Sequence, residues 1–171
     1  DIYDARRVAQ KLDIPHYVFN YEKTFKKDVI DYFVDSYAKG DTPIPCIKCN
    51  ETVKFRDLMD FAKKLEADCM ATGHYVKREG ALDKALMFRA NDKTKDQSYF
   101  LFATTQEQLD FLRFPLGSLT KNETRDFAKK LGLNVHDKKD SQDICFIPNG
   151  DYKSFIKLNA KEGNVIDSSG K

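Results

Sequence analysis

The sequence has no apolar run approaching the roughly 20 residues that a membrane-spanning helix needs. Its first residues, DIYDARRVAQ, are typical of a helix and not of an export signal, so we expect a cytoplasmic protein outside the membrane. An excess of charge of one sign is also missing, because 29 basic and 27 acidic residues leave a net charge of +2. Any contact with nucleic acid must therefore come from local groups and not from the overall charge.

Cysteine is scarce, since the chain has only four thiols, at Cys46, Cys49, Cys69 and Cys145. In a reducing compartment we expect them to be catalytic, metal-ligating or buried and not paired in permanent disulfides. Tetrahedral zinc normally takes four ligands, often from two CxxC pairs, and this chain has one such pair. A zinc ribbon is not expected, whereas an iron–sulfur site that uses Cys46, Cys49 and Cys145 stays open.

The order of the apolar segments predicts an α/β domain. With 41% hydrophobic residues, the chain can fill the core of one ordinary domain and a piece of a second. Segments of helical and of strand period alternate, which is typical of parallel strands joined by helices. One helix has clear limits, because Thr120 and Glu123 form a capping box and Gly132 ends the pattern. We expect helices at 3–12, 26–39, 50–65 and 120–131, strands at 16–21 and 68–72, and the returning arm of a hairpin at 81–90.

The stretch from Thr42 to Phe55, TPIPCIKCNETVKF, carries the strongest chemical signal. Its two prolines restrict the backbone, so the loop that presents Cys46 and Cys49 should be stiff. Asn50 can cap the helix that follows, which would bring the positive end of that helix close to Cys49 and favour its thiolate, the nucleophilic form. A structural turn with buried thiols, or a metal knuckle, fits the same spacing.

Two further strings place polar residues beside apolar segments. In ATGHY, Gly73 follows a predicted strand and would let a ligand ring approach the backbone, while His74 would lie at the mouth of the crevice. In KDQSYFL, the triplet Lys95, Asp96 and Gln97 precedes an apolar helix and suits an RNA backbone or a base edge. An ordinary turn and a solvated helix start explain the same residues.

The two remaining cysteines have weaker chemical signals. Cys69 lies inside the predicted strand at 68–72, where we expect a buried and inert thiol. Cys145 lies among apolar neighbours in the strand-like string SQDICFI, where a buried structural thiol is the default. After a short helix in NGDYKSFIKLNA, the chain reads NVIDSSGK, a strand and turn without a second arm, so we expect it to continue into another module.

Taken in order, TPIPCIKCNETVKF, ATGHY, KDQSYFL and SQDICFI resemble the tRNA-specific 2-thiouridylase family (MnmA), and the resemblance covers essentially the whole chain. It implies a Rossmann-like α/β fold of the adenine nucleotide alpha hydrolase (PP-loop) type, N-terminally incomplete and with a helical insertion. Residues 1–150 would form a partial catalytic domain with its tRNA-contacting helical part. Residues 151–171 would form a linker and the start of a β-rich central domain.

The resemblance also implies roles for single residues. Cys49 would be the nucleophile, Cys145 would carry a persulfide, and Gly73 would lie at an ATP site. The implied tRNA contacts are Ile44, Pro45, Cys46, His74, Lys95, Asp96 and Gln97. The implied cofactors and partners are ATP with Mg, a sulfur-relay protein that donates persulfide sulfur, and the anticodon stem-loop of a tRNA.

The implied reaction replaces the C2 oxygen of the wobble uridine with sulfur. Because a carbonyl oxygen is a poor leaving group, ATP would adenylate it so that AMP can depart. The persulfide on Cys145 would attack C2, and Cys49 would then attack the bridge between Cys145 and C2 at its Cys145 end. A Cys49–Cys145 disulfide would remain, which thiol reductants must open. The fold must therefore bring together two thiols that lie far apart in the sequence.

Two departures from the family pattern leave alternatives open. Cys46 stands where many members have an aspartate, so it is either incidental or joins Cys49 and Cys145 as the third ligand of an iron–sulfur cluster that carries the sulfur. The glycine-rich ATP loop SGGxDS does not occur, so we expect weak or absent ATP binding and no turnover by this chain alone. A non-catalytic RNA-binding module is the third interpretation.

Overall fold

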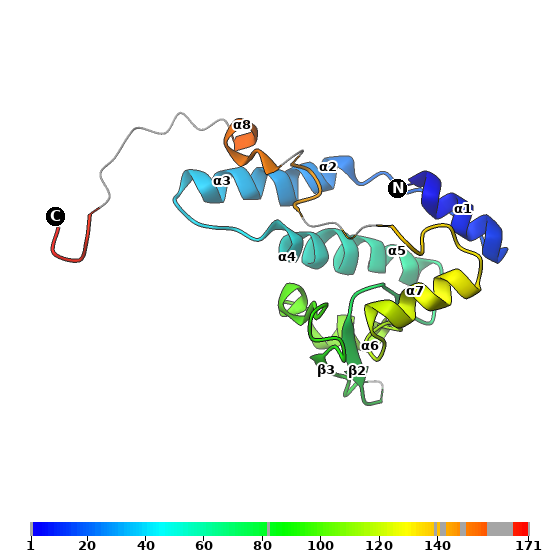
Figure 1. The fold of residues 1–171 in the computed structure, drawn as a ribbon. Helices are drawn as coiled ribbons and strands as arrows, with labels where there is room; N and C mark the ends of the chain where they lie inside the picture. Colours follow the sequence, from blue (N-terminus) through cyan, green and yellow to red (C-terminus); the bar gives the residue numbers. More distant parts are fainter. Residues whose placement is uncertain are drawn as a thin grey trace.

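The computed structural model describes residues 2–81, 83–138, 140, 143–147, 150–156 and 166–170. After helix α1 (Ile2–Leu12), two helical rods lie side by side and run in opposite directions (Figure 1). The first rod consists of α2 (Glu22–Phe25), the π-helical segment η1 (Lys26–Asp31) and α3 (Tyr32–Ala38). The second rod consists of α4 (Pro45–Cys49), the π-helical segment η2 (Asn50–Leu58) and α5 (Met59–Lys64).

The second rod begins about one turn earlier than the sequence predicts. Ile44 is extended, and Pro45 takes the first helical position, where its fixed φ suits a helix and its missing N–H is no loss. Asn50, which we expected to cap this helix, lies inside it and is 4% exposed, so that prediction is wrong. The first rod likewise begins at Glu22 and not at Lys26.

Two short sheets follow the second rod. β1 (Met70–Ala71) pairs in parallel with β4 (Leu112–Arg113), and β2 (Val76–Glu79) pairs antiparallel with β3 (Leu86–Arg89). The parallel pair and the surrounding helices agree with the expected α/β class, and the second pair confirms the predicted hairpin. The strand expected at 16–21 is wrong: the segment forms no strand, and no strand in the described part of the chain lies beside it to supply backbone hydrogen bonds.

The crossover from β1 to β4 contains the hairpin and two short helices. The apolar helix expected in KDQSYFL is the single 3₁₀ segment η3 (Ser98–Leu101), and α6 (Gln106–Phe111) follows it. Beyond β4, α7 (Lys121–Lys130) confirms the predicted capping box, because the Thr120 amide donates to Glu123 Oε2 at 2.7 Å. None of the helices in the described segments is long and apolar enough to cross a membrane.

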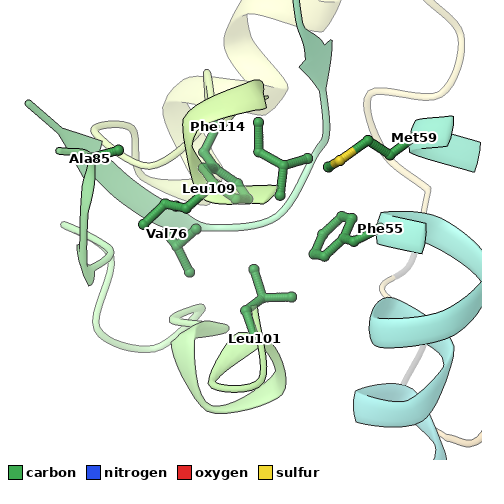
Figure 2. Packing of buried hydrophobic residues seen from close by; sticks show 8 residues of the cluster. Phe55, Met59, Val76, Ala85, Leu101, Leu109 and Phe114 are labelled. Atoms are coloured by element: carbon green, nitrogen blue, oxygen red, sulfur yellow. The ribbon is translucent and has the colours of Figure 1, made fainter. Parts of the chain in front are cut away.

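One cluster of buried side chains, the core cluster, joins the second rod to the hairpin and to α6 (Figure 2). Phe55 and Met59 enter it from the second rod, and each is 2% exposed. A hydrogen bond also links the second rod to α6, because the side-chain amide of Gln108 donates to the Phe55 carbonyl at 2.8 Å. The other members of the core cluster are Val76, Ala85, Leu101, Leu109, Leu112 and Phe114.

A second and smaller cluster, the aromatic cluster, holds the C-terminal part of the described chain against the first rod. Its rings belong to Phe25, Phe33, Phe146 and Phe155. The Phe146 ring lies 5.7 Å from Phe25, 5.5 Å from Phe33 and 5.4 Å from Phe155, measured between ring centroids. Phe155 belongs to the short helix α8 (Tyr152–Ile156), which Figure 1 shows beside the first rod.

The residues around Cys145 do not form the strand that the sequence predicts. Residues 143–147 make a bend and a turn, in which the Ile147 amide donates to the Ile144 carbonyl at 3.0 Å. Ser141 and Gln142 lie outside the described residues, as does most of the strand expected in NVIDSSGK. The proposed boundary between residues 1–150 and 151–171 stays a prediction.

Candidate functional site

A cavity of about 570 Å³ opens where the two rods meet the turn that carries Cys145. Three of the four cysteines, Cys46, Cys49 and Cys145, line this thiol pocket. Its other walls come from the start of the second rod, from the segment after β1, from the Gln97–Phe100 region and from the aromatic cluster. The fold therefore brings together two sequence motifs that are widely separated in the chain.

Different elements position the three thiols. Cys46 and Cys49 are one helical turn apart on α4, so both side chains lie on the same face of the rod. Cys145 is carried by the 143–147 turn, which the neighbouring Phe146 anchors in the aromatic cluster. Cys145 is exposed, so the expected buried structural thiol is wrong: Ile144 and Phe146 on either side of it are half-buried, and the thiol faces the pocket.

The electrostatic setting of Cys49 is opposite to the one expected. Burial raises the pKa of the Cys49 thiol, and nearby Lys54 opposes that rise. Cys46 behaves in the same way, with burial and the neighbouring Cys145 raising its pKa and Lys54 lowering it. We expected the positive end of the helix to lie beside Cys49 and to favour its thiolate. That prediction is wrong, because the helix starts at Pro45 and Cys49 is its fifth residue.

Lys54 is a pocket residue that the sequence patterns did not reveal. Its ammonium donates to Asn50 Oδ1 at 3.0 Å, and the Asn50 amide in turn donates to the Phe100 carbonyl at 3.1 Å. This chain of bonds fixes a positive charge on the pocket wall beside the thiols. The available signal was the spacing of four between Asn50 and Lys54, which places the two side chains on one helix face.

His74 lies on the pocket wall and is held neutral. Thr72 Oγ1 and His74 Nδ1 are 2.8 Å apart, and the imidazole meets the Phe55 ring edge to face with 5.9 Å between centroids. Burial, with a smaller contribution from Lys54, lowers the pKa of His74 to about 4. At neutral pH the ring can therefore donate or accept hydrogen bonds without carrying charge.

Gly73 lies beside the thiol pocket and is not among its lining residues. A Cβ atom built on Gly73 would meet only Leu116 Cδ1, at 3.9 Å, which is ordinary van der Waals contact. Neither packing nor a positive φ therefore demands glycine at this position. Open space at an exposed backbone leaves room for a ligand to approach.

The KDQ triplet divides between two places. Gln97 lines the thiol pocket and is fixed there, because its Oε1 accepts from the Tyr75 amide at 2.9 Å. The Asp96 carboxylate accepts from the Ala90 amide at 2.8 Å and from the Ser98 hydroxyl at 2.7 Å, which holds the loop together.

Lys95 points to a separate polar cavity of about 360 Å³. There it pairs with Asp140 at 2.8 Å, and Lys121 pairs with the same carboxylate at 2.9 Å. Hydrogen bonds from these two lysines lower the pKa of Asp140 to about 2.

The remaining candidates are placed as follows. Ile44 and Pro45 line the thiol pocket beside Cys46. Cys69 is exposed and is not among the lining residues, so the prediction of a buried thiol is wrong. Cys69 precedes the two-residue strand β1 and is not inside it.

The described residues provide no arranged metal site. No group of three or more His, Cys, Asp or Glu side chains in this part of the chain is placed to hold a metal ion. The structure thus gives no support to an iron–sulfur cluster on Cys46, Cys49 and Cys145.

Comparison with known proteins places the chain in a family. Residues 1–149 match the family model described as the tRNA methyl transferase HUP domain, in agreement with a Rossmann-like α/β fold.

A tRNA-specific 2-thiouridylase MnmA of Dinoroseobacter shibae is 60% identical over 99% of this chain and 46% of the relative. Proteins of the same name from Rickettsia massiliae and Jannaschia sp. are 57% and 59% identical over 99% of the chain, which covers 48% and 46% of them. The chain spans about half the length of these curated relatives. It belongs to the tRNA methyl transferase HUP-domain family.

Proposed function

We propose that this chain is part of an enzyme that transfers persulfide sulfur to C2 of the wobble uridine of a tRNA. The observation that carries the proposal is the meeting of Cys49 and Cys145 at one pocket of about 570 Å³. A single nucleobase extruded from an anticodon loop fits a cavity of this size, and such a loop gives up a base at little cost. The relatives named above carry the same activity in their names.

The two thiols have different surroundings that suit different roles. Cys145 is exposed on a turn, where a sulfur-relay protein can reach it to leave a persulfide. Cys49 is half-buried in the second rod, where Lys54 favours its thiolate against the effect of burial. Cys49 lines the same pocket, and its thiolate would attack the Sγ atom of Cys145 in the Cys145–sulfur–C2 bridge. The bond between Cys145 and the transferred sulfur breaks, that sulfur leaves with the base, and a Cys49–Cys145 disulfide remains.

Polar groups on the pocket wall can orient the base. The neutral imidazole of His74 and the amide of Gln97 present hydrogen-bonding atoms, while Ile44 and Pro45 supply an apolar wall. Cys46 lies on the same wall. We assign Lys95 and Asp96 to the tRNA-contacting surface outside the pocket, with Asp96 acting through the loop that it holds.

ATP, with Mg, would supply the adenylate that turns the C2 oxygen into a leaving group. The residue of this chain that we assign to ATP is Gly73, because its exposed backbone has open space around it. The cytoplasm remains the predicted compartment.

The proposal is tested by thiolation of tRNA in the full-length enzyme, followed on gels that retard sulfur-containing RNA. Cys49→Ala and Cys145→Ser should each abolish the product while circular dichroism stays unchanged. Cys69→Ser is the matched control, because that thiol is exposed and outside the pocket, and it should retain activity.

Two other outcomes would favour the alternatives. Full activity of the Cys49→Ala and Cys145→Ser enzymes would overturn the sulfur assignments and favour a non-catalytic RNA-binding module. Visible absorbance of the anaerobic enzyme that disappears with each of Cys46→Ala, Cys49→Ala and Cys145→Ser would show an iron–sulfur cluster in place of a persulfide.

A further inference from the structure

The thiol pocket holds one thiol more than sulfur transfer requires. A persulfide carrier and an attacking thiol complete one turnover, yet Cys46 lines the pocket together with Cys49 and Cys145. Cys46 is exposed, whereas Cys49 is half-buried. A Cys49–Cys145 disulfide would therefore lie beside a third thiol that faces both the pocket and the solvent.

We propose that Cys46 is the resolving thiol that clears the disulfide left by each turnover, an inference that rests on the proposed function. The Cys46 thiolate attacks the sulfur of Cys49 in the Cys49–Cys145 bridge. One S–S bond forms between Cys46 and Cys49, one breaks, and the electron pair leaves on the sulfur of Cys145, which takes up the proton that Cys46 lost. The exchange involves no net oxidation. An external dithiol reductant then opens the Cys46–Cys49 bridge and is itself oxidised.

The helix geometry permits this bridge. Cys46 and Cys49 are three residues apart on α4, and side chains with that spacing have Cβ atoms about 5–6 Å apart. A disulfide needs Cβ atoms about 3.5–4.5 Å apart, so the two residues must approach by roughly 1–2 Å. Cys46 is the second residue of the helix, directly after Pro45, so the approach would come from rotation of the two side chains and a small shift of the first turn.

Exchange also serves the next cycle of sulfur transfer. While the Cys49–Cys145 bridge persists, Cys145 is occupied and cannot accept new sulfur. Exchange moves the bridge to the exposed Cys46 and frees Cys145 to accept new sulfur. Because Cys46, Cys49 and Cys145 all line one pocket, the exchange takes place between thiols that already face the same cavity.

The first test needs neither ATP nor tRNA. The protein is equilibrated in a glutathione redox buffer, quenched with acid, alkylated and mapped by mass spectrometry of non-reduced peptides. We expect Cys46–Cys49 as the main bridge with Cys145 free. Cys46→Ser should shift the main bridge to Cys49–Cys145, and the control Cys69→Ser should leave the map unchanged. A main Cys49–Cys145 bridge in the unmodified protein would overturn the inference.

The second test uses the full-length enzyme during tRNA thiolation with a dithiol reductant. With Cys46→Ser we expect a burst of about one product per enzyme, followed by slow turnover and accumulation of the Cys49–Cys145 bridge. Steady turnover of Cys46→Ser equal to that of Cys69→Ser would overturn the resolving role while leaving the proposed function intact. Absence of thiolated tRNA from the unmodified enzyme would overturn the proposed function itself, and the inference with it.

Discussion

The core cluster and the aromatic cluster hold Cys49 and Cys145 by different means. Cys49 belongs to a rod whose Phe55 and Met59 are almost completely buried among side chains that include members of β2, η3, α6 and β4. Cys145 belongs to a turn that is attached by the half-buried ring of Phe146, packed on the first rod, and by the buried side chain of Ile147. The difference teaches that the stability of the fold and the geometry of the thiol pair depend on separate sets of contacts, which mutations can therefore separate.

The largest effect is expected from Phe55→Ala in the core cluster. Removing a fully buried phenylalanine costs about 3–5 kcal/mol, because apolar contacts are lost and a cavity remains. Urea unfolding followed by circular dichroism measures this loss. Phe127→Ala is the matched control, because that ring on α7 is 52% exposed, and it should change the free energy of unfolding little. Equal losses for the two variants would contradict the assignment of the core.

The next largest effect is a loss of stability at acidic pH, which we expect from His74, the residue that packs against Phe55 on the Cys49 side. The folded pKa of about 4 lies below the unfolded value of 6.5, so the unfolded chain binds more protons between these two values. Stability must therefore fall as the pH decreases from about 6.5 to about 4, by at most about 3 kcal/mol from this group. Urea unfolding at pH 7 and pH 4 measures the fall.

The variant His74→Gln removes this titration and serves as the reference for it. The variant should lose less stability than the unmodified protein over the same pH range. A direct NMR titration of His74 should show the imidazole neutral down to about pH 5, and a midpoint near 6.5 would contradict the buried position of the ring.

What the sequence predicted well is local. The capping box of α7 involves only Thr120 and Glu123, and the hairpin needs only two neighbouring strands of matching period. The strand expected at 16–21 failed because pairing depends on a partner elsewhere, which no local pattern supplies. For the second rod the signal was present in Pro45, a residue favoured at the first helical position, but Asn50 also had the chemistry of a cap.

Three thiols of the thiol pocket were predictable from the sequence, whereas Lys54 and the physical character of the pocket were not. The motifs identified Cys49 and Cys145 as a pair, and the structure places both at one cavity. Burial of Cys145 was wrongly inferred from its apolar neighbours, because a turn can bury Ile147 and half-bury Phe146 while exposing the residue before them. The direction in which the Cys49 pKa shifts depends on burial by segments that are distant in the sequence, and the spacing of residues does not encode that burial.

A smaller effect on stability, but a selective one on chemistry, is expected from Phe146→Ala in the aromatic cluster. The ring is half-buried, and each aromatic contact contributes about 0.5–1.5 kcal/mol beyond its buried area, so the fold should survive. The turn that carries Cys145 loses its anchor. In a Cys46→Ser background, formation of the Cys49–Cys145 bridge by a mild oxidant should therefore slow markedly. Phe127→Ala should leave that rate unchanged, and an equal rate in both variants would contradict the anchoring role.

The smallest effect concerns the charge beside the thiols. Lys54 lowers the pKa of Cys49, so Lys54→Met should raise that pKa further and shift the pH profile of Cys49 alkylation by iodoacetamide to higher pH. Alkylation is read for Cys49 alone by mass spectrometry of its peptide. Lys54→Arg keeps the charge and should restore most of the rate, whereas Lys63→Met removes a lysine that pairs with Glu107 outside the pocket and should change nothing. A Lys54→Met profile that matches Lys63→Met would show that the ammonium does not act on the thiol. The Asn50 bond would then serve only to pack the rod against Phe100.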